Sequence, residues 1–488
     1  MKSVIEVEEK EALMGADAME RIDAYVDEVW EDVVSDIAAL VAHPSVADAS
    51  SAQEGAPFGR PVREALDCAL GIAERLGYQT GDDEGFVGYA DIPGEHSEHI
   101  ATIAHVDVVP AGPGWATDPF AMERREGWLL GRGVIDDKGP AVLSLYAGAY
   151  LLREGITPRY TFRALLGCDE EVGMSDVHHY LETHGQPLFL FTPDAEFPVC
   201  NAEKGCFGGT FASAPVEGGL IRSWSGAEAT NAIPSESVCV LSVPAGELPA
   251  PQANADRLTI DAPEDGFARI FARGIGGHAS LPEGTINAIA LTVGYLREVA
   301  EAKPELFAEQ ERAFLDLLAC VHEDTAGRGL GIASESETFG PLTCNAGTIE
   351  VADGRILQTI DVRFPDSITV DEMRMICSAV AAQYGAEFCQ GSAKEPFSVS
   401  ADSPAVQALL NVYRQVTGKP AEPFAMGGGT YARNFASAVS FGPEDNSLEL
   451  PAWAGTMHGP NEAANEALLR DALKMYILAL LRLNELDL

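Results

Sequence analysis

The sequence HIATIAHVDVVP at residues 99–110 decides the fold class. It is short, apolar and rich in β-branched residues, which is typical of a strand buried on both faces that ends near Pro110. Two similar runs follow, TFRALLGCDEE at 161–171 and FLFTPDAE at 189–196. A helix is expected at about 141–154, between the first two strands. Strands that alternate with helices predict an α/β domain with a largely parallel sheet.

The chain has 488 residues, which is longer than one hydrophobic core usually serves. Helical spacing of apolar residues predicts helices at about 17–41 and 62–76, which would flank the sheet. The pattern changes at about 207–397, where strands mix with long helices, and the first pattern then returns. We therefore predict an α/β domain formed by residues 1–206 and 398–488, with an α+β domain inserted at 207–397.

The composition excludes several classes of partner. The chain has 75 acidic and 32 basic residues and a formal net charge of −43, so its surface repels nucleic acid and anionic membranes. The acidic leader, about residues 1–16, is too polar for a signal peptide, and no apolar run reaches membrane-spanning length. The nine cysteines form no C-x-x-C pair, which predicts reduced thiols, no thiolate zinc site and a cytoplasmic protein.

Acidic residues and histidines follow the expected strands. The carboxyl ends of parallel strands meet at one edge of a sheet, where functional groups gather. Each motif alone is common on protein surfaces, but five of them in one α/β domain predict a shared site. In chain order the motifs are HVD at 105–107, GRGVIDDKG at 131–139, DEE at 169–171, PDAE at 193–196 and MHGPNE at 457–462.

These residue types suit metal-assisted hydrolysis. A carboxylate in the glycine-flanked pair at 136–137 has two oxygens and can bridge two metal ions ~3.5–4 Å apart. Of the adjacent acids at 169–171, one can bind metal while its neighbour acts as general base towards a water. His105 and Asp107 alternate along the strand and would share a face, so Asp107 could orient a metal-binding His105. Histidine and carboxylate ligands favour zinc, with Co²⁺ or Mn²⁺ as alternatives.

The order and spacing of these motifs resemble the co-catalytic zinc peptidases related to carboxypeptidase G and the aminoacylases. Within that family, HVDVVPAGPGWATDPF, TPDAEFP and GGGTYAR are most similar to the V-type dipeptidases, also described as Xaa-His or carnosinase-like dipeptidases. The resemblance runs from about residue 20 to the end of the chain. It implies hydrolysis, by a metal-activated water, of the peptide bond of dipeptides or of very short peptides with a free C-terminal carboxylate.

The resemblance also implies roles for residues of the α/β domain. Glu170 is expected to be the general base, and Asp107 is expected to orient His105. Asp137 is expected to take part in a cis peptide that aims its neighbour. The expected ligands of two Zn²⁺ ions are His105, Asp136, Glu171, Asp194 and His458, with Asp136 as the bridge.

The inserted domain is expected to be the lid of that family. His278, in GIGGHAS, would stabilise the oxyanion, and Arg363, in DVRFP, would hold the substrate carboxylate. This histidine loop departs from the family's pattern at Ile275, where a lysine is frequent. Asn231 is another expected substrate contact of the lid, whereas Gly428, Gly429 and Thr430 are expected to line the cleft from the α/β domain.

The size of the insert bears on assembly. Relatives with small lids dimerise and receive the histidine from the partner subunit, whereas the larger insert at 207–397 implies a monomer. Two alternative functions remain open. An N-acyl-amino-acid hydrolase of the same family would need a neutral acyl pocket in place of an ammonium site, and a non-catalytic binding protein would have lost its metals.

Overall fold

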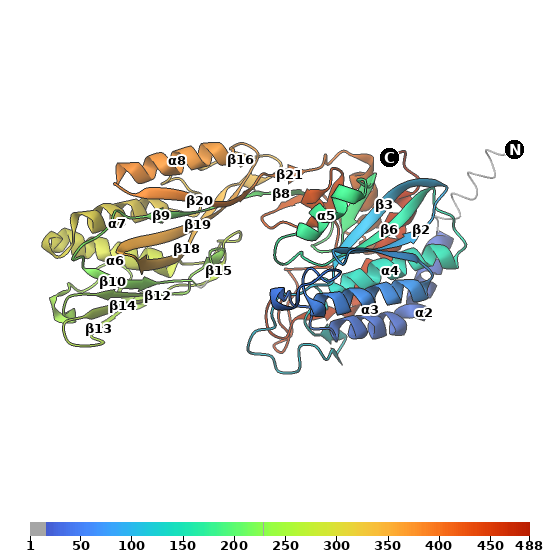
Figure 1. Ribbon diagram of the computed structural model, residues 1–488, viewed down its shortest axis with the longest axis horizontal. Helices are drawn as coiled ribbons and strands as arrows, with labels where there is room; N and C mark the ends of the chain where they lie inside the picture. The colour runs from blue at the N-terminus through green and yellow to red at the C-terminus, as the bar shows by residue number, and fades with distance from the viewer. Residues whose placement is uncertain (1–15, 228) are drawn as a thin grey trace. The chain divides into compact units, whose positions relative to one another are not determined.

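The computed structural model describes residues 16–227 and 229–488, so the acidic leader lies almost wholly outside the described residues. The chain forms two compact units (Figure 1). No helix in the described part of the chain is long and apolar enough to cross a membrane. Among the described residues, the first unit contains 16–201, 398–424 and 429–488, and the second contains 202–397 and 425–428.

The first unit is built on a mixed sheet with a parallel centre, and the chain passes into the second unit within three of its strands, β8, β21 and β22. Its strands are β1 (Gln79–Asp83), β2 (Val87–Ile92), β3 (His96–His105), β6 (Tyr160–Gly167), β7 (Phe189–Thr192), β8 (Cys200–Glu203), β21 (Phe397–Ser398), β22 (Phe424–Met426) and β23 (Ala438–Ser440). The order is β1-β2-β6-β3-β7-β23-β8-β21, with β22 beside β8. The four central strands from β6 to β23 are parallel, and β1 and β2 are antiparallel. The predicted α/β fold with a largely parallel sheet is therefore confirmed.

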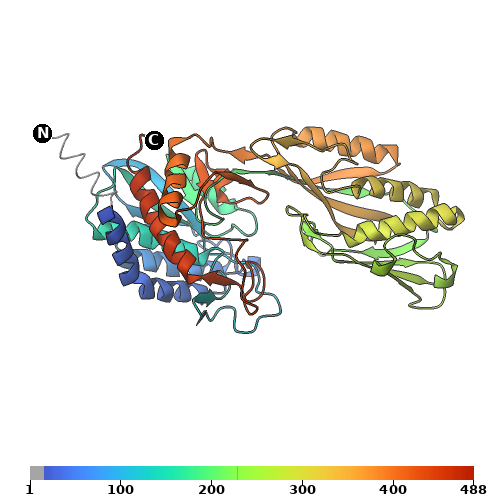
Figure 2. The same ribbon diagram turned by 180° about the vertical axis from the view of Figure 1, so that it is seen from behind.

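Helices flank this sheet, as predicted. They are α2 (Ala16–Val41), α3 (Arg60–Leu76), α4 (Lys138–Arg153), α5 (Ser175–Thr183), α9 (Pro404–Thr417) and α10 (Glu466–Leu483). α4 is buried at every position from Lys138 to Leu151, because α10, α2 and β3 all pack against it. Figure 2 shows α10 with its neighbours α2 and α9. A small sheet, β4 (Glu123–Arg125), β5 (Trp128–Leu130) and β24 (Ala463–Asn465), lies in the same unit.

Strand β3 ends earlier than the sequence suggested. The strand stops at His105, and only one further backbone N–H, that of Val106, bonds to the neighbouring strand end, at Gly167 (2.9 Å). Val108 donates instead to Ser45. The chain therefore leaves the sheet after Val106, so Asp107 lies in a loop and not on the strand as predicted.

The second unit mixes antiparallel sheets with helices. One sheet has the order β18-β19-β9-β20 and the other β10-β12-β14-β13. β11 and β15 form a short antiparallel pair, and β16 and β17 form another. Its strands are β9 (Gly205–Ala212), β10 (Ile221–Ser225), β11 (Ala232–Ile233), β12 (Glu236–Leu241), β13 (Leu258–Asp261), β14 (Ala268–Arg273), β15 (Gly277–His278), β16 (Glu335–Ser336), β17 (Gly340–Pro341), β18 (Thr343–Ala352), β19 (Arg355–Phe364) and β20 (Glu387–Lys394). Its helices are α6 (Ala288–Ala302), α7 (Glu309–Val321) and α8 (Val370–Gln383).

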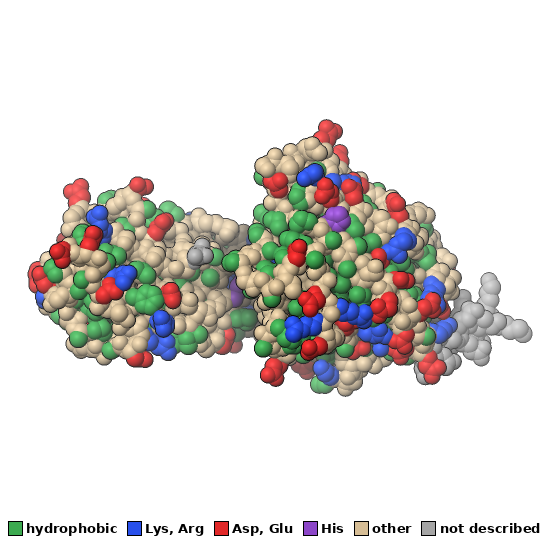
Figure 3. Space-filling view, turned by 90° about the horizontal axis from the view of Figure 1, so that it is seen from below, with side chains coloured by type: hydrophobic (Ala, Val, Ile, Leu, Met, Phe, Trp, Pro, Cys, Tyr) green, Lys and Arg blue, Asp and Glu red, His purple; other side chains and the backbone are tan. Residues whose placement is uncertain are grey.

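The negative charge is spread over the surface. Figure 3 shows acidic side chains scattered over the visible face of each unit, with basic side chains among them. Most acids therefore serve as solvated surface. A carboxylate that is buried and lacks a cationic partner is the exception that needs an explanation.

Candidate active site

The carboxyl ends of three central strands bring acids from separate segments together. β3 ends at His105, which pairs in register with Gly167 at the end of β6. Asp169–Glu171 follow β6, and Asp194 follows β7, which lies on the other side of β3. The topology of the sheet therefore explains why these motifs converge.

Asp136 lies between two histidines. Its Oδ1 is 3.0 Å from Nε2 of His105, and its Oδ2 is 2.9 Å from Nε2 of His458. The same nitrogen of His458 is 3.2 Å from Oε2 of Glu171, and Nε2 of His105 is 3.7 Å from Oδ2 of Asp194. The structure thus brings all five predicted ligands into one cluster, with one Asp136 oxygen facing each imidazole.

Glu170 lies in the same cluster. One oxygen of Glu170, one of Asp194 and a ring nitrogen of His105 all lie within 4.8 Å of one another. Ligand atoms of His105, Asp136 and Glu171 satisfy the same limit. Glu170 is therefore within reach of a reacting group at the cluster, whether it acts as base or as ligand.

The cluster has an excess of buried negative charge. Burial, followed by the charge of Asp136, raises the pKa of Asp194 to about 7. Burial and the charge of Asp194 also raise the pKa of Glu170 well above its ordinary value. Hydrogen bonds to Asp136 and Glu171 raise the pKa of His458 to about 11. Crowded carboxylates and imidazoles of this kind are the N/O donors that divalent cations prefer, so these residues fit a metal centre.

Asp107 connects two of the strand ends. Nδ1 of His105 lies 2.9 Å from the backbone oxygen of Asp107 and 3.4 Å from its Oδ1. The Asp107 carboxylate also accepts the backbone N–H groups of Glu170 (3.3 Å) and Glu171 (3.2 Å). Asp107 therefore orients His105 and fixes the acidic loop after β6, although it does so from a loop and not from the strand.

A buried ion pair, to which the sequence analysis assigned no role, supports the cluster. The Glu462 carboxylate accepts the backbone N–H groups of Gly133 (3.0 Å) and Ile135 (3.2 Å) and pairs with Arg132. Arg132 also donates to the backbone oxygen of His458 (3.2 Å). Both side chains are fully buried. The pair therefore joins the loop that carries Asp136 to the loop that carries His458. In the sequence, the only hint of this pair was that Arg132 and Glu462 each lie inside one of the five motifs.

We expect Arg132→Met to lower the free energy of unfolding by about 3–5 kcal/mol, because it leaves the Glu462 carboxylate buried without its partner. The matched control is Arg153→Met, which breaks the exposed pair with Glu28 and should cost less than about 1 kcal/mol. Urea unfolding of both variants is the measurement. If both variants lost the same small amount of unfolding free energy, the role assigned to the buried pair would be contradicted.

Comparison with known proteins now identifies the family. A family model described as peptidase family M20/M25/M40 matches residues 101–482.

The chain belongs to this peptidase family.

Relatives of the M20 peptidase support the assignment. The Beta-Ala-Xaa dipeptidase of Lactobacillus delbrueckii subsp. lactis is 32% identical over 460 residues, which cover 91% of this chain and 93% of the relative. The structure of human carnosine dipeptidase 1 matches with a TM-score of 0.58 at 15% identity, covering 96% of this chain and 99% of that one. The Bacillus subtilis YXEP protein, described as a dinuclear metal-binding peptidase, matches with a TM-score of 0.52 at 12% identity, covering 95% and 99%. The predicted family and peptidase class are confirmed.

Two predicted substrate contacts of the M20 peptidase lie in the first unit. Thr430 is buried, and its Oγ1 accepts the N–H of Ala432 (3.1 Å) and lies 3.1 Å from Oγ of Ser440. Its hydroxyl thus serves as a helix cap. Gly429 sits close to Arg433, because an added Cβ would lie 2.5 Å from Nη1 of that residue.

The other predicted contacts lie in the second unit. Asn231 accepts the N–H of Ala279 (2.8 Å) through its backbone oxygen, next to His278 on β15. Ser280 donates its backbone N–H to Nδ1 of His278 (3.2 Å), and its Oγ lies 2.7 Å from the same atom. A ring nitrogen that accepts an N–H carries no proton, so in neutral His278 the proton is on Nε2. Gly428 belongs to the second unit with its neighbour Gly427.

Arg363 makes more hydrogen bonds within the protein than the sequence suggested. Its Nε and Nη2 donate to the two oxygens of Asp361 (2.8 and 3.1 Å), and its Nη1 donates to the backbone oxygen of Gly427 (2.9 Å) and to Sγ of Cys206 (3.1 Å). A guanidinium has five N–H donors, so one N–H on Nη2 remains for a further acceptor. Asp361 therefore holds the fork in a fixed orientation.

Proposed function

We propose that this M20 peptidase is a dipeptidase that binds two Zn²⁺ ions through His105, Asp136, Glu171, Asp194 and His458. It hydrolyses the peptide bond of dipeptides, or of very short peptides with a free C-terminal carboxylate. The observation that carries the proposal is Asp136, whose two oxygens face His105 and His458 separately. The name of the Lactobacillus relative, a Beta-Ala-Xaa dipeptidase, supports the same substrate class.

The ions, when bound, supply Lewis acidity and a water acidified enough to attack near neutral pH. Glu170 takes the proton from the attacking water and passes it to the nitrogen of the leaving amine. Asp107 holds the ring of His105 in place through Nδ1. His278, with its proton on Nε2, donates to the oxygen of the tetrahedral intermediate.

Three further features belong to the proposal. The inserted unit acts as the lid, because it carries Asn231, His278 and Arg363 while the predicted metal ligands lie in the first unit. The chain acts as a monomer, which light scattering would test. It acts in the cytoplasm, which the nine cysteines support because all of them are free thiols.

The proposed function predicts metal-dependent hydrolysis of dipeptides. Purified protein treated with a chelator should be inactive on a dipeptide library, and added Zn²⁺, Co²⁺ or Mn²⁺ should restore activity. Hydrolysis of N-acetyl amino acids without hydrolysis of dipeptides would favour the deacylase alternative. Absence of bound metal by elemental analysis, with no activity after metal addition, would favour a binding protein.

Arg363 is proposed to bind the C-terminal carboxylate of the substrate, as a carboxylate clamp that limits substrate length. Wild-type enzyme should cleave a dipeptide with a kcat/KM roughly tenfold or more above that of its C-terminal amide, because a charge-assisted hydrogen bond to Arg363 is lost with the carboxylate. Arg363→Lys should lose most of this preference, since lysine cannot reproduce the fork that Asp361 aligns. Arg355→Lys, on the same strand and paired with Glu387, is the matched control. Equal kcat/KM values for dipeptide and amide on wild-type enzyme would rule out the clamp.

A further inference from the structure

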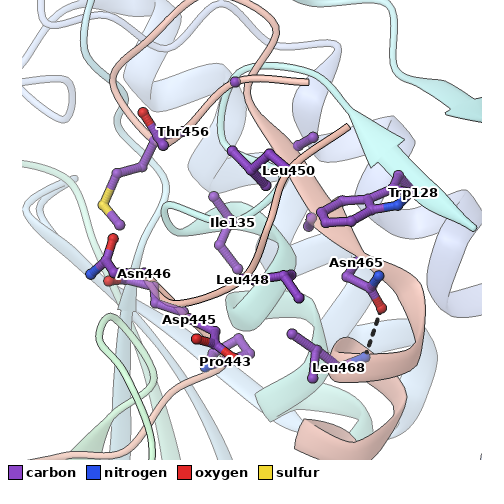
Figure 4. A pocket seen from close by; sticks show the side chains of 15 residues that line it. Trp128, Ile135, Pro443, Asp445, Asn446, Leu448, Leu450, Thr456, Asn465 and Leu468 are labelled. Atoms are coloured by element: carbon purple, nitrogen blue, oxygen red, sulfur yellow. Dashed lines mark hydrogen bonds between the residues drawn. The ribbon is translucent and has the colours of Figure 1, made fainter. Parts of the chain in front are cut away.

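A cavity lies beside the metal cluster, wholly within the first unit. It is an open hollow between the small β4-β5-β24 sheet and the loop that precedes His458. Ile135 and Met457 line it, and each is the chain neighbour of a proposed metal ligand. Figure 4 shows Trp128, Ile135, Leu448 and Leu450 around the same hollow. The apolar wall consists of Trp128, Ile135, Leu448, Leu450, Met457 and Leu468.

Glu444 is the cavity residue whose backbone is fixed against the segment around Asp194. Its N–H donates to the backbone oxygen of Ala195 (3.1 Å), and its backbone pairs with that of Glu196. Just before it, Gly442 approaches so closely that an added Cβ would lie 1.7 Å from the backbone oxygen of Pro193. Glu444 therefore has a rigid position beside a proposed metal ligand.

The carboxylate of Glu444 is not directly paired with a cationic side chain in the described part of the chain. Among the described residues it has no side-chain hydrogen bond or ion pair, although it is partly buried. Glu444 is also absent from the groups of side chains whose oxygen and nitrogen atoms lie close enough to share a metal ion. The site therefore fits a cation that enters from the cavity.

We propose that this cavity receives the amino-terminal residue of the substrate, with Glu444 accepting the ammonium group and the apolar wall accepting an apolar side chain. The inference rests on the proposed function and specifies its substrate class. The amino group of a peptide has a pKa near 7.7–8.0 and is mostly charged at neutral pH. An N-acyl group is neutral and would leave Glu444 without its partner, so free dipeptides are favoured over N-acyl amino acids.

The test compares two substrates that differ only in the amine, leucyl-alanine and 4-methylpentanoyl-alanine. Wild-type enzyme should prefer leucyl-alanine by roughly 30-fold or more in kcat/KM, because loss of one partner of a buried charge pair costs about 2 kcal/mol or more. Glu444→Gln should lose most of this preference, mainly through a lower kcat/KM for leucyl-alanine, with metal content unchanged. Glu449→Gln, an exposed acid in the same loop, should keep the wild-type ratio.

The outcomes separate this inference from the proposed function. An unchanged ratio in Glu444→Gln, in an enzyme that still hydrolyses leucyl-alanine, would overturn the ammonium site and leave the dipeptidase proposal intact. Loss of metal in Glu444→Gln would also overturn it, because Glu444 would then be a ligand. If wild-type enzyme with added metal cleaved no dipeptide, both proposals would fail together.

The apolar wall has its own test. Leu450→Trp narrows the cavity and should lower kcat/KM for leucyl-alanine roughly tenfold or more relative to glycyl-alanine, which places no side chain there. Unchanged metal content and melting temperature would show that the variant is folded. Equal losses for both substrates would overturn the assignment of the wall to the substrate side chain.

Discussion

Replacing Glu170 with glutamine is expected to lower kcat by roughly 10²–10⁴-fold, the range for loss of a general base. The amide keeps the size of the side chain but cannot take a proton from water. Glu170 is placed for this role because its carboxylate lies within 4.8 Å of ligand atoms of His105 and Asp194. Asp107 fixes it further, by accepting its backbone N–H (3.3 Å).

Steady-state kinetics and elemental analysis of the same preparation test this prediction. Metal content and melting temperature should equal those of wild type. Glu182→Gln changes an exposed acid of the same unit and should leave kcat unchanged. Near-normal turnover in Glu170→Gln would show that another group takes the proton, whereas loss of metal would make Glu170 a ligand.

The convergence of the acids was predictable because it depends on topology. His105, the acids at 169–171 and Asp194 each follow a strand, and they converge if those strands are parallel neighbours. The three strands β6, β3 and β7 are parallel neighbours in the sheet. The position of the helices followed from apolar spacing in the same way. His458 joins this edge from the far end of the sequence, where its motif was one of the five predicted to share a site, but only the family resemblance gave it a role as a metal ligand.

Details that depend on side-chain partners were not predictable. The end of β3 is decided by where backbone N–H groups find acceptors, and Val108 bonds to Ser45, which lies far away in the sequence. Arg132 and Glu462 likewise become partners only when two distant loops fold together. The engagement of Arg363 by Asp361 could have been suspected, because alternate residues on a strand share a face.

The sequence also gave no sign that Glu444 differs from other acids. Most acids in a chain with a net charge of −43 are solvated, and a lone glutamate after a strand is usually one of them. Its distinction comes from the position of the 442–446 loop against 193–196. Whether the Glu444 carboxylate has a hydrogen-bond or ion-pair partner depends on the folded structure and cannot be read from the sequence.

His458 gives the second large expected effect. Its Nε2 lies 2.9 Å from Asp136 and 3.2 Å from Glu171, so it is the imidazole donor on the side of the cluster away from His105. Removing even a group that only supports a ligand typically costs 10–100-fold in metal affinity. We therefore expect His458→Ala to lose metal affinity by roughly 100-fold or more, and to lose activity with it.

The backbone at His458 requires a second variant. His458 has a φ of 61°, a left-handed conformation that alanine adopts less readily than asparagine. His458→Asn tolerates this conformation but cannot place an imidazole nitrogen at the cluster, so it should lose metal as His458→Ala does. His178→Ala, which removes an exposed histidine on α5, is the control for histidine loss. The measurements are elemental analysis after dialysis and kcat. Full metal content and full activity in His458→Asn would remove His458 from the ligand set. Loss of both, with an unchanged melting temperature of the apo-protein, would show that the imidazole holds the metal.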